Sequence, residues 1–167
     1  MSEKRIDPTL TGLFLVAFVT SSFGLLGLEV YTGKDFGMSS APTIALIAGI
    51  MIAVLMVSAI RYGDAFVAPL MGFVAISLIV VPFVGAGAMI ILAVLYYAFV
   101  IAGILVKLPK LMVLLLTIVG TLYLVVGLGG LMGEDIFLLL QGILGLSAGT
   151  LALYISLALA TQKLPMV

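Results

Sequence analysis

The polar side chains inside the long apolar stretches of this chain are neutral, and they are the groups best suited to contact a solute. Hydroxyl and amide groups donate and accept hydrogen bonds without changing charge near neutral pH. Those predicted to line a solute path are Thr20, Ser77, Thr121, Tyr123 and Gln141. Each hydroxyl can instead bond to a carbonyl of its own helix or hold two helices together. Gln141 is the least compatible with lipid, so we expect it to face protein or water.

Catalytic and metal-binding chemistry lacks its usual residues. The 167 residues include no Cys and no His, which argues against Ser-His-Asp and Cys-His nucleophile systems, His-held haem, and ordinary zinc or iron–sulfur sites. No Asp, Glu, Lys or Arg falls near the middle of an apolar stretch, where such groups usually mark ion or proton routes. The sequence therefore predicts a protein that is not an enzyme and uses no cofactor or metal. No basic cluster is dense enough for nucleic acid.

Six apolar stretches carry the neutral polar groups. Mean hydropathy is +1.47 and charged residues make up 8% of the chain, against about 25% in soluble domains. Since about 20 residues cross a bilayer as a helix, we expect one all-α transmembrane domain over residues 1–167. The expected spans are residues 10–28, 42–60, 65–83, 88–106, 111–132 and 136–160. Pro69 lies inside the third span and is expected to kink it or to free a backbone carbonyl there.

Basic residues fall almost entirely on one side of this arrangement. The connections on that side hold Lys4, Arg5, Arg61, Lys107, Lys110 and Lys163. The three opposite connections hold only Lys34, in a polar loop expected over residues 29–40. Short loops rich in Lys and Arg stay in the cytoplasm. The pattern predicts a multi-pass protein of the cell's inner (cytoplasmic) membrane with both termini cytoplasmic.

Small residues share one face of the last span. Gly142, Gly145 and Gly149 lie at helical spacing on the face that carries Gln141. The small-xxx-small pattern of Gly145 and Gly149 lets helix backbones approach closely. We expect these glycines to pack helices together, within or between subunits.

Three segments resemble one known family. Residues 7–13 (Asp-Pro-Thr-Leu-Thr-Gly-Leu) resemble the Asn-Pro-Ala-Pro-Leu-Gly-Leu signature that precedes the first span of the acetate uptake transporter family. Residues 61–66 (Arg-Tyr-Gly-Asp-Ala-Phe) resemble its connection between spans two and three. Residues 142–154 resemble its Gly- and Ala-rich final span, which ends in Tyr. This family includes bacterial acetate/succinate–proton symporters.

The resemblance implies a homo-hexameric ring in which each subunit has its own path. In the family, apolar and aromatic side chains of spans one, three and five narrow that path. The corresponding positions here are Val16 beside Phe18, Val74 beside Phe73, and Leu122 and Val125. Asp7 replaces the signature Asn at the mouth of the path.

The implied substrate is a small monocarboxylate such as acetate, accompanied by protons. A bare anion in the bilayer centre costs several kcal/mol, whereas neutralising a carboxyl group of pKa ~4.3 at pH 7 costs roughly 3.7 kcal/mol. We therefore expect either the neutral acid or a hydrated anion to cross.

Two other functions fit the same residues. One is a channel for urea or a short amide, and the other is a non-transporting scaffold subunit of a membrane complex.

Overall fold

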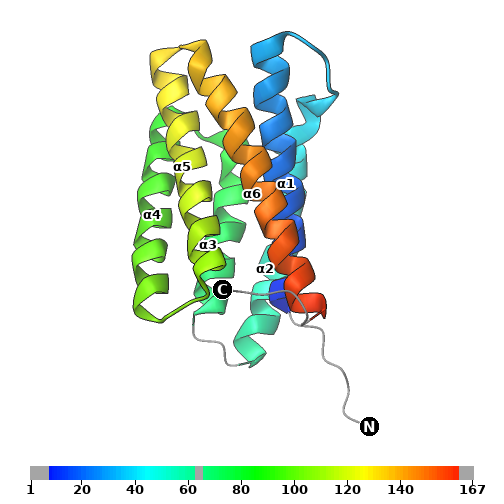
Figure 1. The fold of residues 1–167 in the computed structure, drawn as a ribbon, viewed down its shortest axis with the longest axis vertical. Helices are drawn as coiled ribbons and strands as arrows, with labels where there is room; N and C mark the ends of the chain where they lie inside the picture. Colours follow the sequence, from blue (N-terminus) through cyan, green and yellow to red (C-terminus); the bar gives the residue numbers. More distant parts are fainter. Residues whose placement is uncertain (1–7, 63–65, 162–167) are drawn as a thin grey trace.

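The computed structural model describes residues 8–62 and 66–161, and all regular secondary structure in that part of the chain is helical (Figure 1). Its α-helices are α1 (Pro8–Thr32), α2 (Ala41–Tyr62), α3 (Val67–Val80), α4 (Ala86–Leu105), α5 (Lys110–Met132) and α6 (Asp135–Thr161). Two 3-10 turns, η1 (Met38–Ser40) and η2 (Val81–Phe83), lie before α2 and after α3. The all-α prediction is confirmed. Apart from α3, each of these helices is long and apolar enough to cross a membrane.

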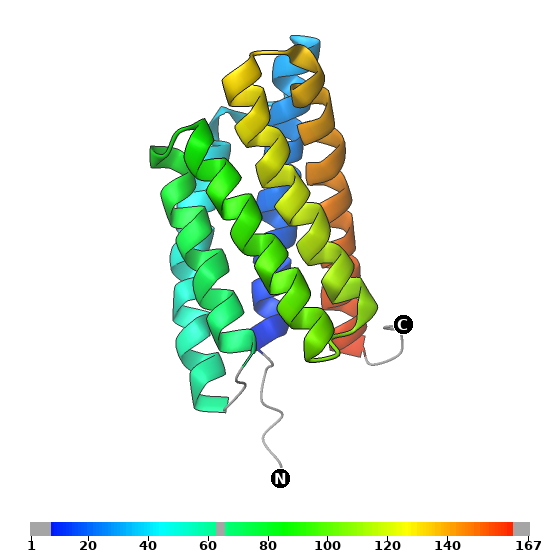
Figure 2. The same cartoon turned by 90° about the vertical axis from the view of Figure 1, so that its left-hand side faces the viewer.

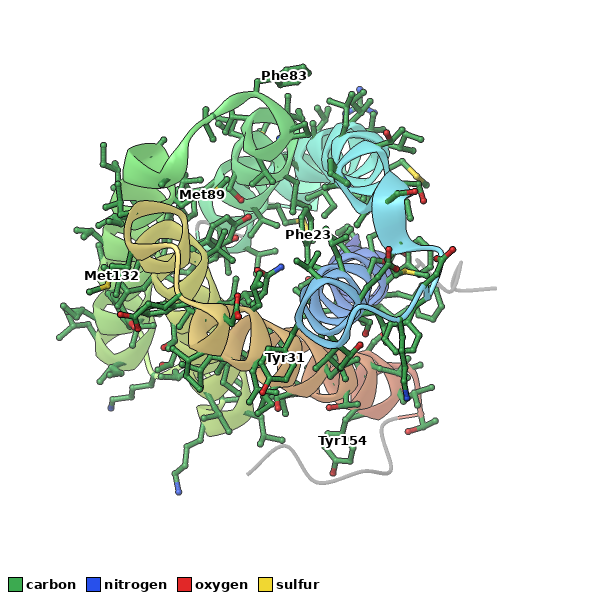
Figure 3. The ribbon with its side chains drawn as sticks, turned by 90° about the horizontal axis from the view of Figure 1, so that it is seen from above. Phe23, Tyr31, Phe83, Met89, Met132 and Tyr154 are labelled. Atoms are coloured by element: carbon green, nitrogen blue, oxygen red, sulfur yellow. The ribbon has the colours of Figure 1, made fainter. Side chains whose placement is uncertain are left out.

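The helices form a ring that follows the order of the chain. Helix α1 packs on α2, α2 on α3, α4 on α5, α5 on α6, and α6 returns to α1. Because the connections are short, successive helices run in opposite directions, and α1 begins at the end of the ring where α6 finishes. Seen from above, the ring surrounds an interior toward which Phe23 and Met89 point (Figure 3). The side view shows the α3–α4 connection set lower than the α5–α6 connection (Figure 2).

Helix α1 continues past its predicted end at residue 28 and includes Glu29, which was expected in a loop. It ends at Gly33, whose φ of +67° suits glycine and whose N–H donates to the Glu29 carbonyl at 2.9 Å. The Glu29 carboxylate accepts hydrogen bonds from the backbone N–H groups of Phe36 and Met38, each at 2.9 Å. Glu29 thus fastens the loop before α2 to the end of α1.

Pro69 does not have the structural role expected from the sequence. Helix α3 begins at Val67, so Pro69 lies in its first turn. N–H groups in a first turn have no acceptor within the helix, and a proline there removes no helical hydrogen bond. The expected kink therefore has no cause at this position.

Helices α1 and α6 pack backbone against backbone. A β-carbon added at Gly145 would lie 2.5 Å from the Cα of Gly24 and 2.7 Å from the Thr20 carbonyl oxygen. One added at Gly149 would lie 3.0 Å from the Ala17 carbonyl oxygen. Only glycine allows this approach. We call this contact the α1–α6 seam; its glycines are Gly24, Gly27, Gly142, Gly145 and Gly149.

Candidate functional site

Two cavities inside the ring meet at one layer of side chains. The larger has a volume of about 300 Å³ and the smaller about 80 Å³. Four residues line both of them, one each from α1, α3, α4 and α5. These residues, which we call the waist, are Val16, Val74, Tyr96 and Val119. The waist is therefore the boundary between the two cavities.

The cavities follow one another from one end of the ring to the other. The smaller cavity includes Thr9, at the start of α1, and Leu108, in the connection between α4 and α5. The larger extends from the waist to Pro42 at the start of α2 and to Gln141. A third cavity of about 310 Å³ shares Gln141 with the larger one and continues to the ends of α5 and α6. Together they outline a path along the axis of the ring.

The lining of this path is uncharged over most of its length. Among the described residues, the two cavities that meet at the waist are lined by no Lys, Arg, Asp or Glu. Glu134 and Asp135 line only the third cavity, at the end of the path. Three valines and one tyrosine make the waist an apolar layer, and apolar layers of this kind can form constrictions that exclude water.

A hydrogen-bonded cluster of three hydroxyls lies against the waist. Ser77 is completely buried, and its Oγ donates to the Val74 carbonyl at 2.8 Å. The same Oγ lies 3.2 Å from the Tyr96 hydroxyl and 3.4 Å from the Tyr123 hydroxyl. The rings of Tyr96 and Tyr123 stack with centroids 5.2 Å apart. We call Ser77, Tyr96 and Tyr123 the Ser77 cluster; it joins α3, α4 and α5 across the interior.

Aromatic rings fill the space between α3 and α4. Phe73 contacts the edge of Tyr96 at a centroid distance of 4.8 Å and stacks on Phe99 at 5.0 Å. Phe66 meets Phe99 at 6.3 Å. Because large rings separate these two helices, their backbones stay further apart than those of the α1–α6 seam. Phe73 packs against Tyr96 from behind and lines none of the three cavities described above.

Gln141 lies where the larger and third cavities join. Its side chain is 9% exposed, and its Nε2 donates to the Phe23 carbonyl of α1 at 3.1 Å. A β-carbon at Gly27 would lie 3.1 Å from the Gln141 Cγ, so glycine at this position leaves room for the amide. The Thr20 hydroxyl, further along the larger cavity, donates to the Val16 carbonyl at 2.8 Å.

Most of the residues predicted to form the path line one of these cavities or lie directly behind the lining. The larger cavity is lined by Val16, Thr20, Val74, Leu122, Tyr123 and Gln141. Val125 lines the third cavity. Ser77 and Phe73 contact Tyr96 from behind.

Two predicted path residues lie elsewhere. Phe18 is 56% exposed on the outer surface of this chain, and it lines none of the three cavities described above. Thr121 faces α4, where its Oγ1 lies 2.9 Å from the Tyr97 hydroxyl. Asp7, the predicted mouth residue, lies outside the described residues.

The sequence pattern does not identify Val119 as a waist residue, and it does not single out Tyr96 among the aromatic residues of the spans. Val119 carries no polar signal among many valines. Tyr96 does carry one, because a hydroxyl in an apolar span needs a hydrogen-bond partner. Ser77 and Tyr123 are mid-span groups able to provide it. Pairing these hydroxyls across helices would have placed Tyr96 in the interior.

Comparison with known proteins gives a match at the level of structure. No protein-family model matches the sequence, and no curated protein matches it. The solved structure of the bacterial acetate channel SatP superposes with a TM-score of 0.72 at 16% sequence identity. The match covers 97% of this chain and 99% of the SatP chain. The chain therefore has the fold of this bacterial channel, as its resemblance to the acetate uptake transporter family implies.

Proposed function

We propose that this protein is a multi-pass membrane transporter or channel for small monocarboxylates such as acetate. The observation that carries the proposal is the pair of cavities inside the ring that meet at an apolar waist and whose described lining residues are uncharged. The fold shared with an acetate channel supports the choice of solute. A cavity needs about 10–15 Å³ to hold one water molecule, so the larger cavity has room for a small acid.

The charge of the lining supports proton linkage as part of this proposal. An acetate anion at the waist would meet no cationic side chain among the described lining residues, and an unpaired charge there costs several kcal/mol. Protonating a carboxyl group of pKa ~4.3 at pH 7 costs roughly 3.7 kcal/mol. The two costs are comparable, so solute and proton can cross together as the neutral acid. No carboxylate within a span is needed for this coupling.

Orientation and assembly are part of the same proposal. Arg61, Lys107 and Lys110 lie at the end of the ring where α1 begins, and Lys34 lies at the other end. The excess of basic residues favours a cytoplasmic location for the first end. A reporter active only in the cytoplasm, fused at the C-terminus, should therefore be active. Native mass spectrometry in detergent should give six times the subunit mass, as the family resemblance implies.

Uptake into liposomes tests the proposed function. Labelled acetate and labelled urea are supplied to liposomes that contain the purified protein, at outside pH 5.5 and 7.5. We expect saturable acetate entry above protein-free liposomes, faster with an inward proton gradient. Urea entry without acetate entry would instead indicate a neutral-solute channel, which the uncharged lining also fits. Entry of neither solute would favour the scaffold function and direct attention to co-purifying subunits.

A further inference from the structure

The hydroxyl hydrogens beside the waist can be assigned from their partners. Each hydroxyl has a single hydrogen, and a carbonyl oxygen can only accept. Ser77 lies 2.8 Å from the Val74 carbonyl, so its hydrogen is donated there. At its contacts with Tyr96, at 3.2 Å, and Tyr123, at 3.4 Å, Ser77 must therefore accept. Both tyrosine hydrogens point at Ser77.

This arrangement leaves only acceptors facing the larger cavity near the waist. Tyr96 and Tyr123 line that cavity, and their hydrogens are used by Ser77, so each presents oxygen lone pairs. Thr20 lines the same cavity and gives its hydrogen to the Val16 carbonyl at 2.8 Å. All three hydroxyls are therefore able to accept a hydrogen bond from a solute but not to donate one.

The remaining side-chain donor lies at the other end of the cavity. The carbonyl of Phe23 can only accept, so the Gln141 amide nitrogen faces it and gives it one N–H at 3.1 Å. The second N–H of Gln141 is the one donor left among the described side chains of this cavity. An acetate anion, which only accepts, could use Gln141 but would find no partner beside the waist. Acetic acid carries an O–H that matches the acceptors.

We infer that Ser77 is a specificity-determining positioning residue. By accepting hydrogen bonds from both tyrosines, it leaves only hydrogen-bond acceptors on the lining beside the waist. This lining favours the passage of solutes that donate hydrogen bonds. The favoured solute is then a protonated monocarboxylic acid, and the acceptor-only anion is disfavoured. This inference rests on the proposed function. It assigns the selection to a side chain that does not line the cavity itself.

Ser77→Ala tests this assignment. The substitution removes the acceptor, so the tyrosine hydrogens can turn into the cavity and serve as donors to an anion. In the wild-type protein, protein-dependent acetate flux should fall about 100-fold from pH 5.5 to 7.5, because the neutral fraction falls about tenfold per pH unit above the acid's pKa. In Ser77→Ala the same ratio should shrink to about tenfold or less. Taking the ratio within each protein removes differences in the amount of folded protein.

Matched variants separate this role from a general effect on the fold. Ser77→Thr keeps a hydroxyl and should retain the wild-type pH ratio. Adding Tyr96→Phe and Tyr123→Phe to Ser77→Ala removes the new donors and should bring back the steep pH dependence. Thr117→Ala removes a hydroxyl that donates to the Val113 carbonyl away from the cavities, and it should leave the ratio unchanged.

The outcomes distinguish failure of this inference from failure of the proposed function. Wild-type acetate flux that does not change with pH would overturn the acceptor filter and leave acetate transport standing. A Ser77→Ala ratio equal to the wild-type ratio would overturn the role of Ser77. Absence of protein-dependent acetate flux at both pH values would overturn the proposed function and the filter with it.

Discussion

The α1–α6 seam and the α3–α4 face hold the ring together in opposite ways. At the seam, glycines bring two backbones into contact, with a β-carbon position at Gly145 only 2.5 Å from the Cα of Gly24. At the α3–α4 face, the rings of Phe73, Tyr96 and Phe99 fill the space between helices, with centroid distances of 4.8 and 5.0 Å. Both contacts lie in apolar segments, so the size of the side chains distinguishes them.

This difference explains where the path runs. Lipid provides no hydrophobic force between helices, so their association depends on packing and hydrogen bonds. Small residues close one side of the ring, and large rings keep the other side open. The waist lies next to the large rings, through Tyr96. We therefore expect substitutions at the seam to change stability and substitutions near the rings to change flux.

The largest expected effect is at the seam. Gly145→Ala places a β-carbon against the backbone of α1, which cannot move away as a flexible side chain could. Overpacking of this kind costs about 3 kcal/mol, and we expect the thermal unfolding temperature in detergent to fall markedly. Gly87→Ala, in α4, is the matched control because its β-carbon would meet nothing within 4 Å. Equal stability of the two variants would contradict the tight seam.

The next effect is on flux. Val16→Phe adds a ring at the waist, where the two cavities meet, and should reduce acetate uptake at least about tenfold, equivalent to about 1.4 kcal/mol. Val30→Phe is the same change on the outer surface of the same helix, and its uptake should match the wild type. Similar uptake by both variants would show that the solute does not pass the waist.

A substitution among the rings should separate flux from stability. Phe73→Leu removes the aromatic contacts to Tyr96 and Phe99, worth about 1 kcal/mol. Unfolding should therefore shift only modestly, while uptake changes several-fold because Tyr96 loses its support at the waist. Uptake and unfolding are measured on the same preparation. A large loss of stability with unchanged uptake would contradict the expectation that substitutions near the rings change flux more than stability.

The smallest effect is expected at Thr121. Thr121→Val removes the hydrogen bond to the Tyr97 hydroxyl, and such bonds between membrane helices average about 0.6 kcal/mol. Uptake should stay at the wild-type level, because Thr121 faces α4 rather than the cavities. A strong loss of uptake would instead indicate that Thr121 contributes to the path, as the sequence predicted.

Hydropathy predicts the helices well because it reflects transfer into lipid, and each of the six apolar stretches contains one α-helix. It says little about which face points inward, because these helices are apolar on every side. Val16 and Phe18 are two residues apart, which is about 200° around a helix. One lines the waist and the other lies on the outer surface. The resemblance placed Val16 in the path, and pattern alone could not exclude its neighbour.

The Ser77 cluster could not be predicted for a different reason. Its three hydroxyls come from three helices, and their meeting depends on how far the rings of Phe73 and Phe99 separate α3 from α4. That spacing is a property of the packed ring. By contrast, the spacing of Gly145 and Gly149 in the sequence predicts a close contact between helices. The partner helix, α1, becomes known only from the structure.

The α1–α6 seam also has a consequence for biosynthesis. It joins the first and the sixth helix, so the five helices made before α6 cannot close the ring by themselves. The enclosed path does not exist until α6 leaves the ribosome and reaches α1. A nascent chain that stalls before α6 therefore lacks the helix that closes the ring around the cavities. Arrival of the last helix closes the ring and completes the wall around the cavities in a single step.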